Sequence, residues 1–97
     1  MYARVARFEG GDGDAIRRAA EEIGRQAASG PPEGLPAVGF LLLIDPDGGR
    51  SMGVSFFESE ADMRVGDRML DDMSPPGDGM GRRAAVEMYE VAADLRT

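Results

Sequence analysis

The stretch Val38-Gly39-Phe40-Leu41-Leu42-Leu43-Ile44 decides the fold, because it is a strand-length run that is apolar at every position after its glycine. Neither side of such a strand favours water. A turn is predicted at Asp45-Pro46-Asp47-Gly48-Gly49, and Met52-Gly53-Val54-Ser55-Phe56-Phe57 returns as a second apolar strand. A small domain with few helices covers only one face of a sheet. We therefore expect a second copy to cover the other face, with Leu42 on a central strand between the subunits.

Length and charge limit the possible partners. The 97 residues predict a single domain over positions 1–97. With 11 basic and 18 acidic residues, the net charge is −7. This charge repels phosphate backbones and anionic lipids, so neither nucleic acid nor a membrane is an expected partner. The longest apolar run is far shorter than the roughly 20 residues that span a bilayer, and the expected location is cytoplasmic.

Three residue types with distinctive chemistry are absent from the chain: cysteine, histidine and tryptophan. Without cysteine there is no disulfide, thiolate metal site or cysteine nucleophile. Without histidine there is no serine–histidine triad, imidazole-bound zinc or histidine-ligated haem. We therefore expect no metal and no cofactor.

Periodicity predicts six elements in the order strand, helix, strand, strand, helix, strand. Asp12 or Asp14 can cap the first helix, and Ser59-Glu60-Ala61-Asp62 resembles a capping box that opens the second. The strands are predicted at residues 2–8, 38–44, 52–57 and 85–92. This order predicts a ferredoxin-like βαββαβ plait in the α+β class, a four-stranded antiparallel sheet with two helices on one face.

Four segments of the chain carry a resemblance to a known family: Tyr2-Ala3-Arg4-Val5-Ala6-Arg7-Phe8-Glu9, Gly39-Phe40-Leu41-Leu42-Leu43-Ile44-Asp45, Ser55-Phe56-Phe57-Glu58-Ser59-Glu60-Ala61 and Val86-Glu87-Met88-Tyr89-Glu90-Val91. They resemble the dimeric α+β barrels related to antibiotic-biosynthesis monooxygenases, and the resemblance covers nearly the whole chain. The resemblance implies a homodimer whose two sheets pack face to face, with a small cavity between each sheet and its own helices.

The resemblance also implies activities, which include cofactor-independent oxidation of aromatic polyketides and oxidative cleavage of haem. The haem-degrading members use an Asn, a Trp and a His, and these places are matched here by Arg4, by Phe57 and by no histidine. Haem chemistry is therefore not expected. The polyketide-oxidising members orient a phenolic substrate with Asn, Trp, Tyr and Arg, and this chain has neither Asn nor Trp. The expected function is binding of a small, largely apolar or aromatic molecule in a cavity between the sheet and the helices, with cofactor-independent monooxygenation as a further option.

Three residues are candidates for substrate binding, and each has a structural alternative. Arg4 can hold a phenolate or carboxylate, or pair with Glu87 or Glu90 on a neighbouring strand. Tyr89 can donate to a ligand oxygen, or be a core tyrosine bonded to backbone. Phe57 can form a pocket wall, or be simple core.

Other readings of the chain stay open. A non-catalytic dimeric regulatory or structural module is the main alternative function. Metal-assisted catalysis by Glu58, Glu60 and Asp62 is a third, although their spacing suits helix capping better. The segment Gly77–Arg83 is a candidate mobile loop over the cavity mouth.

Overall fold

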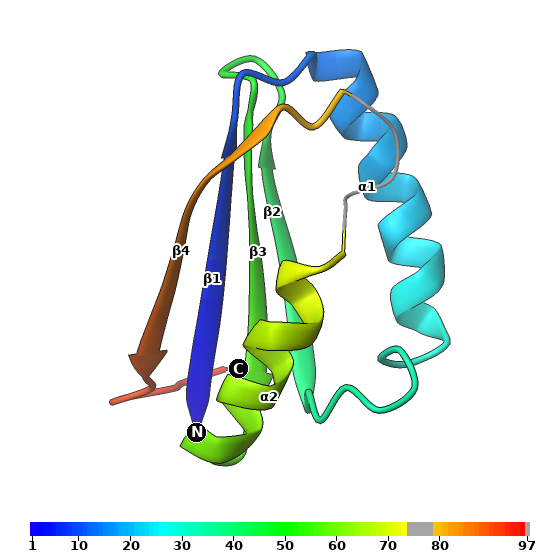
Figure 1. The fold of residues 1–97 in the computed structure, drawn as a ribbon. Coiled ribbons are helices and arrows are strands. Elements are labelled where there is room, and N and C mark those ends of the chain that lie inside the picture. The colour runs from blue at the N-terminus through cyan, green and yellow to red at the C-terminus, as the bar shows by residue number, and fades with distance from the viewer. Residues whose placement is uncertain (74–78, 97) are drawn as a thin grey trace.

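The computed structural model describes residues 1–73 and 79–96 (Figure 1). The predicted order of elements is confirmed. The chain forms β1 (Tyr2–Glu9), α1 (Gly13–Ala28), β2 (Gly39–Asp45), β3 (Arg50–Phe57), α2 (Glu60–Asp71) and β4 (Arg82–Glu90).

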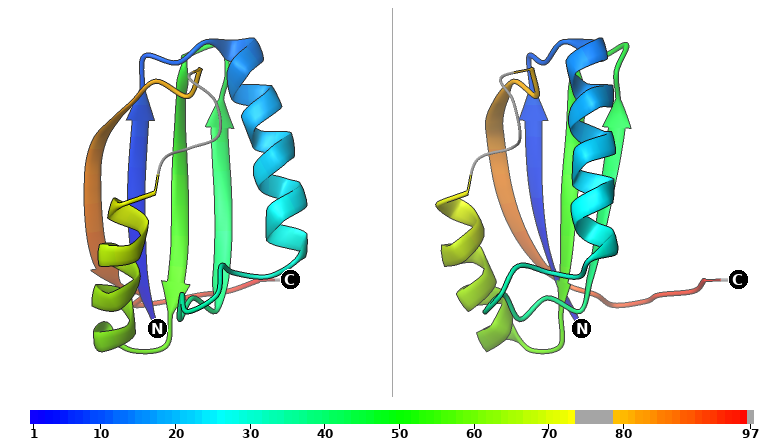
Figure 2. Two further views of the ribbon diagram at one scale, coloured as in Figure 1. Left: turned by 45° about the vertical axis from the view of Figure 1, so that its right-hand side comes forward. Right: turned by 90° about the vertical axis from the view of Figure 1, so that its right-hand side faces the viewer.

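The four strands form one sheet in the order β2-β3-β1-β4, and every neighbouring pair is antiparallel. Both helices lie on the same face of this sheet (Figure 2). The fold is therefore the predicted ferredoxin-like βαββαβ plait. β1 and β3 are the central strands, while β2 and β4 form the edges.

Side-chain caps start both helices where the sequence predicts them. Asp12 accepts a hydrogen bond from the Ala15 amide at 3.0 Å, and Ser59 Oγ accepts one from the Asp62 amide at 3.1 Å. These bonds satisfy backbone donors that have no partner inside the helix. Within the described residues, neither helix combines the length and the apolar composition that crossing a membrane would require.

The last strand differs from its predicted bounds, because it starts earlier and ends earlier than residues 85–92. A bulge between Arg7 and Phe8 shifts the register, after which Phe8 pairs with Arg83 and Glu9 with Arg82. Gly81 has a φ of +84° just before the strand, a conformation that glycine adopts without strain.

Register assigns each side chain to one of two faces. Arg4 bonds to Asp67 on α2, so Arg4 and its cross-strand partners point toward the helices. Alternation then places the neighbouring residues on the opposite side, which we call the open face. The open face comprises Ala3, Val5, Arg7, Leu41, Leu43, Met52, Val54, Phe56, Glu87 and Tyr89.

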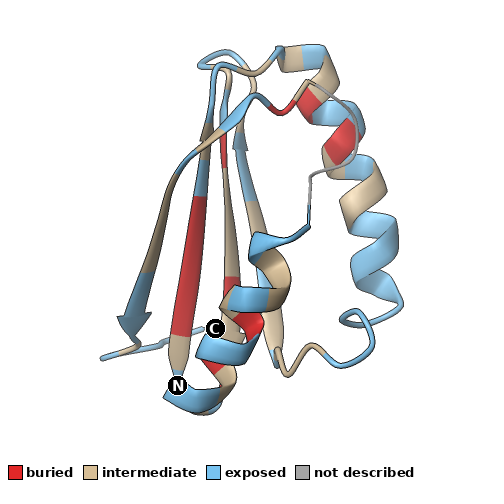
Figure 3. Ribbon diagram, in the orientation of Figure 1, coloured by how far each residue is buried: buried red, intermediate tan, exposed pale blue. Residues whose placement is uncertain are grey.

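The core lies between the sheet and the helices (Figure 3). One cluster joins Ile16 and Ala19 of α1 to Met80, with Ile23 and Leu42 packed beside it. At the other helix, the fully buried ring of Phe57 lies against Gly66 of α2. Each helix therefore has its own packing centre on the sheet.

The placement of Leu42 corrects the expectation that it lies on a central strand between subunits. β2 is an edge strand, and Leu42 packs toward Ile16 and α1 rather than on the open face. Its neighbours Leu41 and Leu43 occupy the open face and are 44% and 51% exposed. The apolar character of both sides of β2 is as predicted, but the residues that a second copy would meet are Leu41 and Leu43.

Candidate binding cavity

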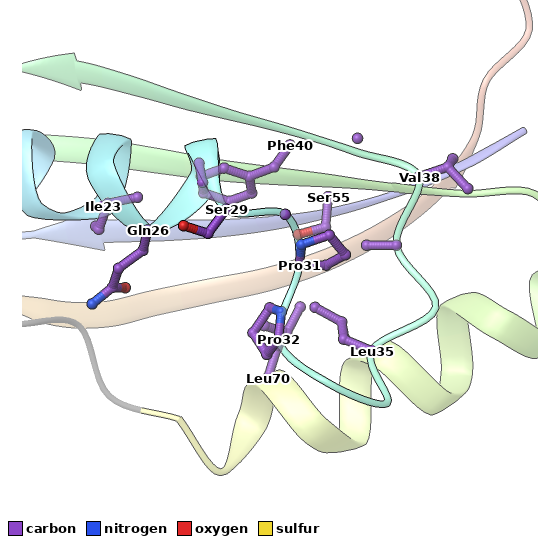
Figure 4. Close-up of a pocket in the computed structure, with 14 residues that line it drawn as sticks. Ile23, Gln26, Ser29, Pro31, Pro32, Leu35, Val38, Phe40, Ser55 and Leu70 are labelled. Atoms are coloured by element: carbon purple, nitrogen blue, oxygen red, sulfur yellow. The ribbon is translucent and has the colours of Figure 1, made fainter.

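A cavity of about 740 Å³ lies between the two helices on the covered side of the sheet (Figure 4). Its walls come from the end of α1, the connection between α1 and β2, the start of β2, one residue of β3 and one of α2. Most of the lining is apolar: Ile23, Ala27, Pro31, Pro32, Leu35, Ala37, Val38, Phe40 and Leu70. Such a lining favours an apolar ligand.

Polar side chains enter the lining at three places, Gln26, Ser29 and Ser55. Ser55 is only 4% exposed, and it is the one residue of β3 in the lining (Figure 4). Gln26 donates to the Glu22 carboxylate at 3.2 Å, so it already has one partner on its own helix. These groups can orient a ligand by hydrogen bonding.

Arg4 lies beside this cavity as a buried cation. It is 4% exposed, and its Nε donates to Asp67 Oδ1 at 2.8 Å. Its Nη2 is buried and has no hydrogen-bond partner among the described residues. Arg4 stands directly opposite Ser55 in the β1–β3 register, and Ser55 lines the cavity. Leu70, which also lines the cavity, lies three residues after Asp67 on α2. The Arg4–Asp67 ion pair therefore has a cavity-lining neighbour on each side. The alternative pairing with Glu87 or Glu90 is wrong, because the partner is Asp67 on α2.

Phe57 has a relative exposure of 0% and packs on Gly66. It is not among the residues that line the cavity. Its ring therefore supports α2 from beneath.

Tyr89 lies on the open face, on the other side of the sheet from Arg4. It is 49% exposed, and its hydroxyl donates to Glu87 Oε2 at 2.9 Å. Arg7 Nε donates to the other oxygen of the same carboxylate at 2.6 Å. The structure therefore does not bring Tyr89 together with Arg4.

These contacts shift three pKa values on the open face. The hydrogen bond from Arg7 is the main cause that lowers the pKa of Glu87. The same bond raises the pKa of Arg7, and the bond to Glu87 raises the pKa of Tyr89. Glu87 is thus held as a carboxylate between two donors.

Two other predicted features lie outside the cavity. Within residues 1–73 and 79–96, no group of three or more acidic side chains lies close enough together to hold a metal ion; Glu60 pairs with Arg64. Of the segment Gly77–Arg83, residues 77 and 78 lie outside the described residues. Met80 is 2% exposed in the core with Ile16, and the cavity lining does not include it.

Comparison with solved structures identifies the fold. The haem degrader MhuD from Mycobacterium tuberculosis, with two haems in its active site, is 18% identical; the match covers 99% of this chain and 100% of MhuD, with a TM-score of 0.67. A variant of MhuD with two manganese protoporphyrin IX molecules per active site is 19% identical, with full coverage of both chains and a TM-score of 0.67. The chain has the antibiotic-biosynthesis-monooxygenase-like fold. No protein-family model matches the chain, and no curated protein matches its sequence.

Sequence reasoning missed the cavity lining, because none of the candidates Arg4, Phe57 and Tyr89 is among the residues that line it. Pro31 and Pro32, in the connection that follows α1, form one wall. A signal for Ser55 was available: it is a hydroxyl residue inside an otherwise apolar strand. Ser51 and Ser55 share the covered face of β3 and are 7% and 4% exposed.

Proposed function

We propose that the protein binds a small, largely apolar or aromatic molecule in the cavity between the sheet and its helices. The single observation behind this proposal is the cavity itself, whose 740 Å³ lies within the range of roughly 300 to 1,000 Å³ that small-molecule sites occupy. Its lining combines many apolar side chains with a few polar ones, which is the composition that such sites use.

We also propose that the ligand carries a carboxylate or phenolate oxygen. Arg4 is a buried guanidinium with one unused donor, and Ser55 beside it opens into the cavity. A carboxylate or phenolate accepts strong hydrogen bonds from such a donor. Of the three predicted binding residues, Arg4 is the direct contact in this proposal, Phe57 holds α2 in position, and Tyr89 belongs to the open face.

Haem does not fit the cavity, although the structural neighbours bind haem or a manganese porphyrin in theirs. Protein ligands to haem iron are His, Cys, Met or Tyr side chains. The chain has no His or Cys, and the cavity lining includes no Met or Tyr. A metal-free organic ligand is therefore the better proposal.

Cofactor-independent monooxygenation of the bound molecule stays a prediction. In such a reaction a ring CH₂ group and O₂ yield C=O and water, and the substrate itself supplies the electrons. Oxygen uptake with a substrate of this type would support the prediction if it disappears in a variant whose cavity is filled by a larger side chain.

We also propose that two copies associate through the open face. Leu41 and Leu43 are about half exposed there. Exposed aliphatic side chains on the uncovered side of a sheet favour burial against another surface, and a second copy is the simplest self-complementary partner.

Calorimetry with 2-naphthoate and its neutral analogue 2-naphthamide tests the cavity. We expect saturable binding, with 2-naphthoate preferred. Ala27→Trp fills the cavity from the exposed end of α1 and should weaken binding at least tenfold. Ala28→Trp is the matched control, because Ala28 is the next exposed residue but is not part of the lining.

Arg4→Met should remove the preference for the acid while leaving the amide bound. Absence of saturable binding by both probes at 1 mM, or equal binding by the Ala27 and Ala28 variants, would contradict the proposed site.

A further inference from the structure

The last described residues form an extended arm, Val91 to Arg96, that follows β4 without joining a helix or strand. Its first residue donates a backbone hydrogen bond to the Met1 carbonyl at 2.9 Å. Figure 2 shows the arm crossing the ends of the strands from the β4 side toward β2 and continuing past that edge. The arm therefore lies over one end of the open face.

Two side chains of the arm turn toward its own sheet. Asp94 and Arg96 line a shallow hollow together with Leu41 and Phe56. The Arg96 guanidinium lies 5.4 Å from the centre of the Phe56 ring, within cation–π range. Arg96 also donates a hydrogen bond to the Asp94 carboxylate at 3.1 Å, and this bond restricts both side chains.

Leu95 lies between these two residues and points away from the sheet, because side chains alternate along an extended chain. It is 90% exposed, more than any other large apolar residue described. Its exposure is about twice that of Leu41 and Leu43, which are 44% and 51% exposed. A surface that settles on the open face would meet Leu95 first.

The area of the open face indicates what the arm adds. Four strands at about 4.8 Å spacing and eight residues at about 3.4 Å give a face of roughly 500 Å². A standard interface needs about 800 Å² from each partner. Six extended residues reach up to about 20 Å, which matches the width of the sheet. The arm can therefore supply much of the missing contact.

We infer that the arm is an exchanged contact between two copies of this chain, with Leu95 of each copy buried on the other. This inference rests on the proposed association through the open face, and it assigns a specific anchor to that association. In a twofold dimer each arm lies between the two sheets, held to its own sheet by Arg96 and to the partner by Leu95.

Sedimentation velocity over a range of protein concentrations tests the inference, with the full chain and two point variants. Each Leu95→Ser change removes one buried leucine, and the dimer contains two of them. The dimer dissociation constant should rise by about 100-fold. Val65→Ser is the matched control: Val65 is an exposed apolar residue on α2, away from the open face, and its loss should leave the constant unchanged.

The outcomes separate the two proposals. A wild-type dimer that Leu95→Ser does not weaken would overturn the arm and leave the open-face dimer standing. A wild-type protein that stays monomeric at 100 µM would overturn both, and would leave the open face for a different partner. Circular dichroism should show the same fold in all three proteins.

Discussion

Gly66 on α2 lies directly against the ring of Phe57 on β3, and a Cβ atom at position 66 would overlap the ring carbons Cε1 and Cζ. The ring cannot move aside easily, because Phe57 is completely buried. This contact brings α2 close to the sheet and fixes its distance. Since Leu70 and Asp67 sit on the same helix, the contact also sets one wall of the cavity and the partner of Arg4.

Gly66→Ala should therefore destabilise the protein, although alanine normally favours a helix. We expect a loss of about 1 to 3 kcal/mol in the free energy of unfolding, from overpacking against Phe57. Urea unfolding measures it. Gly24→Ala on α1 is the control, because nothing lies within 4 Å of its added methyl group, and it should gain up to about 1 kcal/mol. Stabilisation by both variants would contradict the close contact.

The Arg4–Asp67 pair should cost more to break than an exposed pair. Asp67→Asn leaves a buried guanidinium without its charged partner, and we expect a loss of about 2 to 3 kcal/mol. The expected loss lies below the roughly 3 to 5 kcal/mol of a fully buried pair, because the Asp67 side chain is 30% exposed. Arg64→Ala breaks an exposed pair with Glu60 and should cost less than about 0.5 kcal/mol. Thermal unfolding measures both variants. If Asp67→Asn and Arg64→Ala lose the same amount of stability, Arg4 is solvated rather than buried.

Arg83 should hold the end of α2 to β4. Its two Nη atoms donate to the carbonyls of Leu70, Asp71 and Met73, and its guanidinium lies 5.8 Å from the centre of the Phe8 ring. Carbonyls at the C-terminal end of a helix lack amide donors from a following turn, and here only that of Leu70 is also seen to accept a backbone bond, from the Met73 amide at 3.1 Å, among the described residues. Arg83→Ala should destabilise the protein by about 1 to 3 kcal/mol.

Hydrogen exchange should localise that effect to the last turn of α2. Arg83→Lys should restore only part of the loss, because an ammonium group lacks the planar fork that reaches several acceptors. Arg82→Ala is the neighbouring control: this side chain is 74% exposed and lies 3.6 Å from Glu9. Equal exchange rates in the two alanine variants would contradict the assigned role.

The Glu87 carboxylate gives the open face a defined pH response. Its pKa in the folded protein lies below the unfolded value, so its contribution to stability is fully present above the unfolded pKa and is lost as pH falls through the folded pKa. Arg7→Gln should raise the Glu87 pKa toward 4.5, its ordinary value, because Arg7 is the largest cause of the shift. Tyr89→Phe should raise it less. Carbon-detected NMR titration distinguishes the two, and a larger effect of Tyr89→Phe would reverse the assignment.

Leu41 and Leu42 should respond differently to the same change, because they lie on opposite faces of β2. Leu42→Asp places a carboxylate beside Ile16, and we expect a loss of at least about 2 kcal/mol in the stability of each subunit. Leu41→Asp should change subunit stability by less than about 0.5 kcal/mol and weaken association instead. Urea unfolding and sedimentation at matched concentrations separate these effects; equal unfolding midpoints would contradict the assigned faces.

Local sequence patterns predict the helices and strands of this chain well. They do not predict the features that depend on pairing between distant strands. The caps at Asp12 and Ser59 follow from residues within one helical turn, so a single sequence contains them. The order of strands does not, since it depends on which strands pair. This is why Leu42 was expected on a central strand and lies on an edge.

The candidate site shows the same division. Alternation separates Tyr89 from Met88, but only the β1–β4 register, in which Arg4 faces Met88, places Tyr89 on the side away from Arg4. The partner of Arg4 depends on how α2 is rotated against the sheet, and Gly66 and Phe57 set that rotation. Pro31 and Pro32 line the cavity because of the path that the connection between α1 and β2 takes. No periodic sequence pattern predicts that path.

Half of the residues that line the cavity belong to the connection between α1 and β2, while the strands contribute only Ser55 and the first two residues of β2. Substitutions in that connection change the shape of the cavity without disturbing strand register or the packing centres under the helices. Ligand preference can therefore diverge among descendants of this chain faster than its architecture does. The connection from residue 29 to residue 38 is also where directed evolution toward a new ligand should begin.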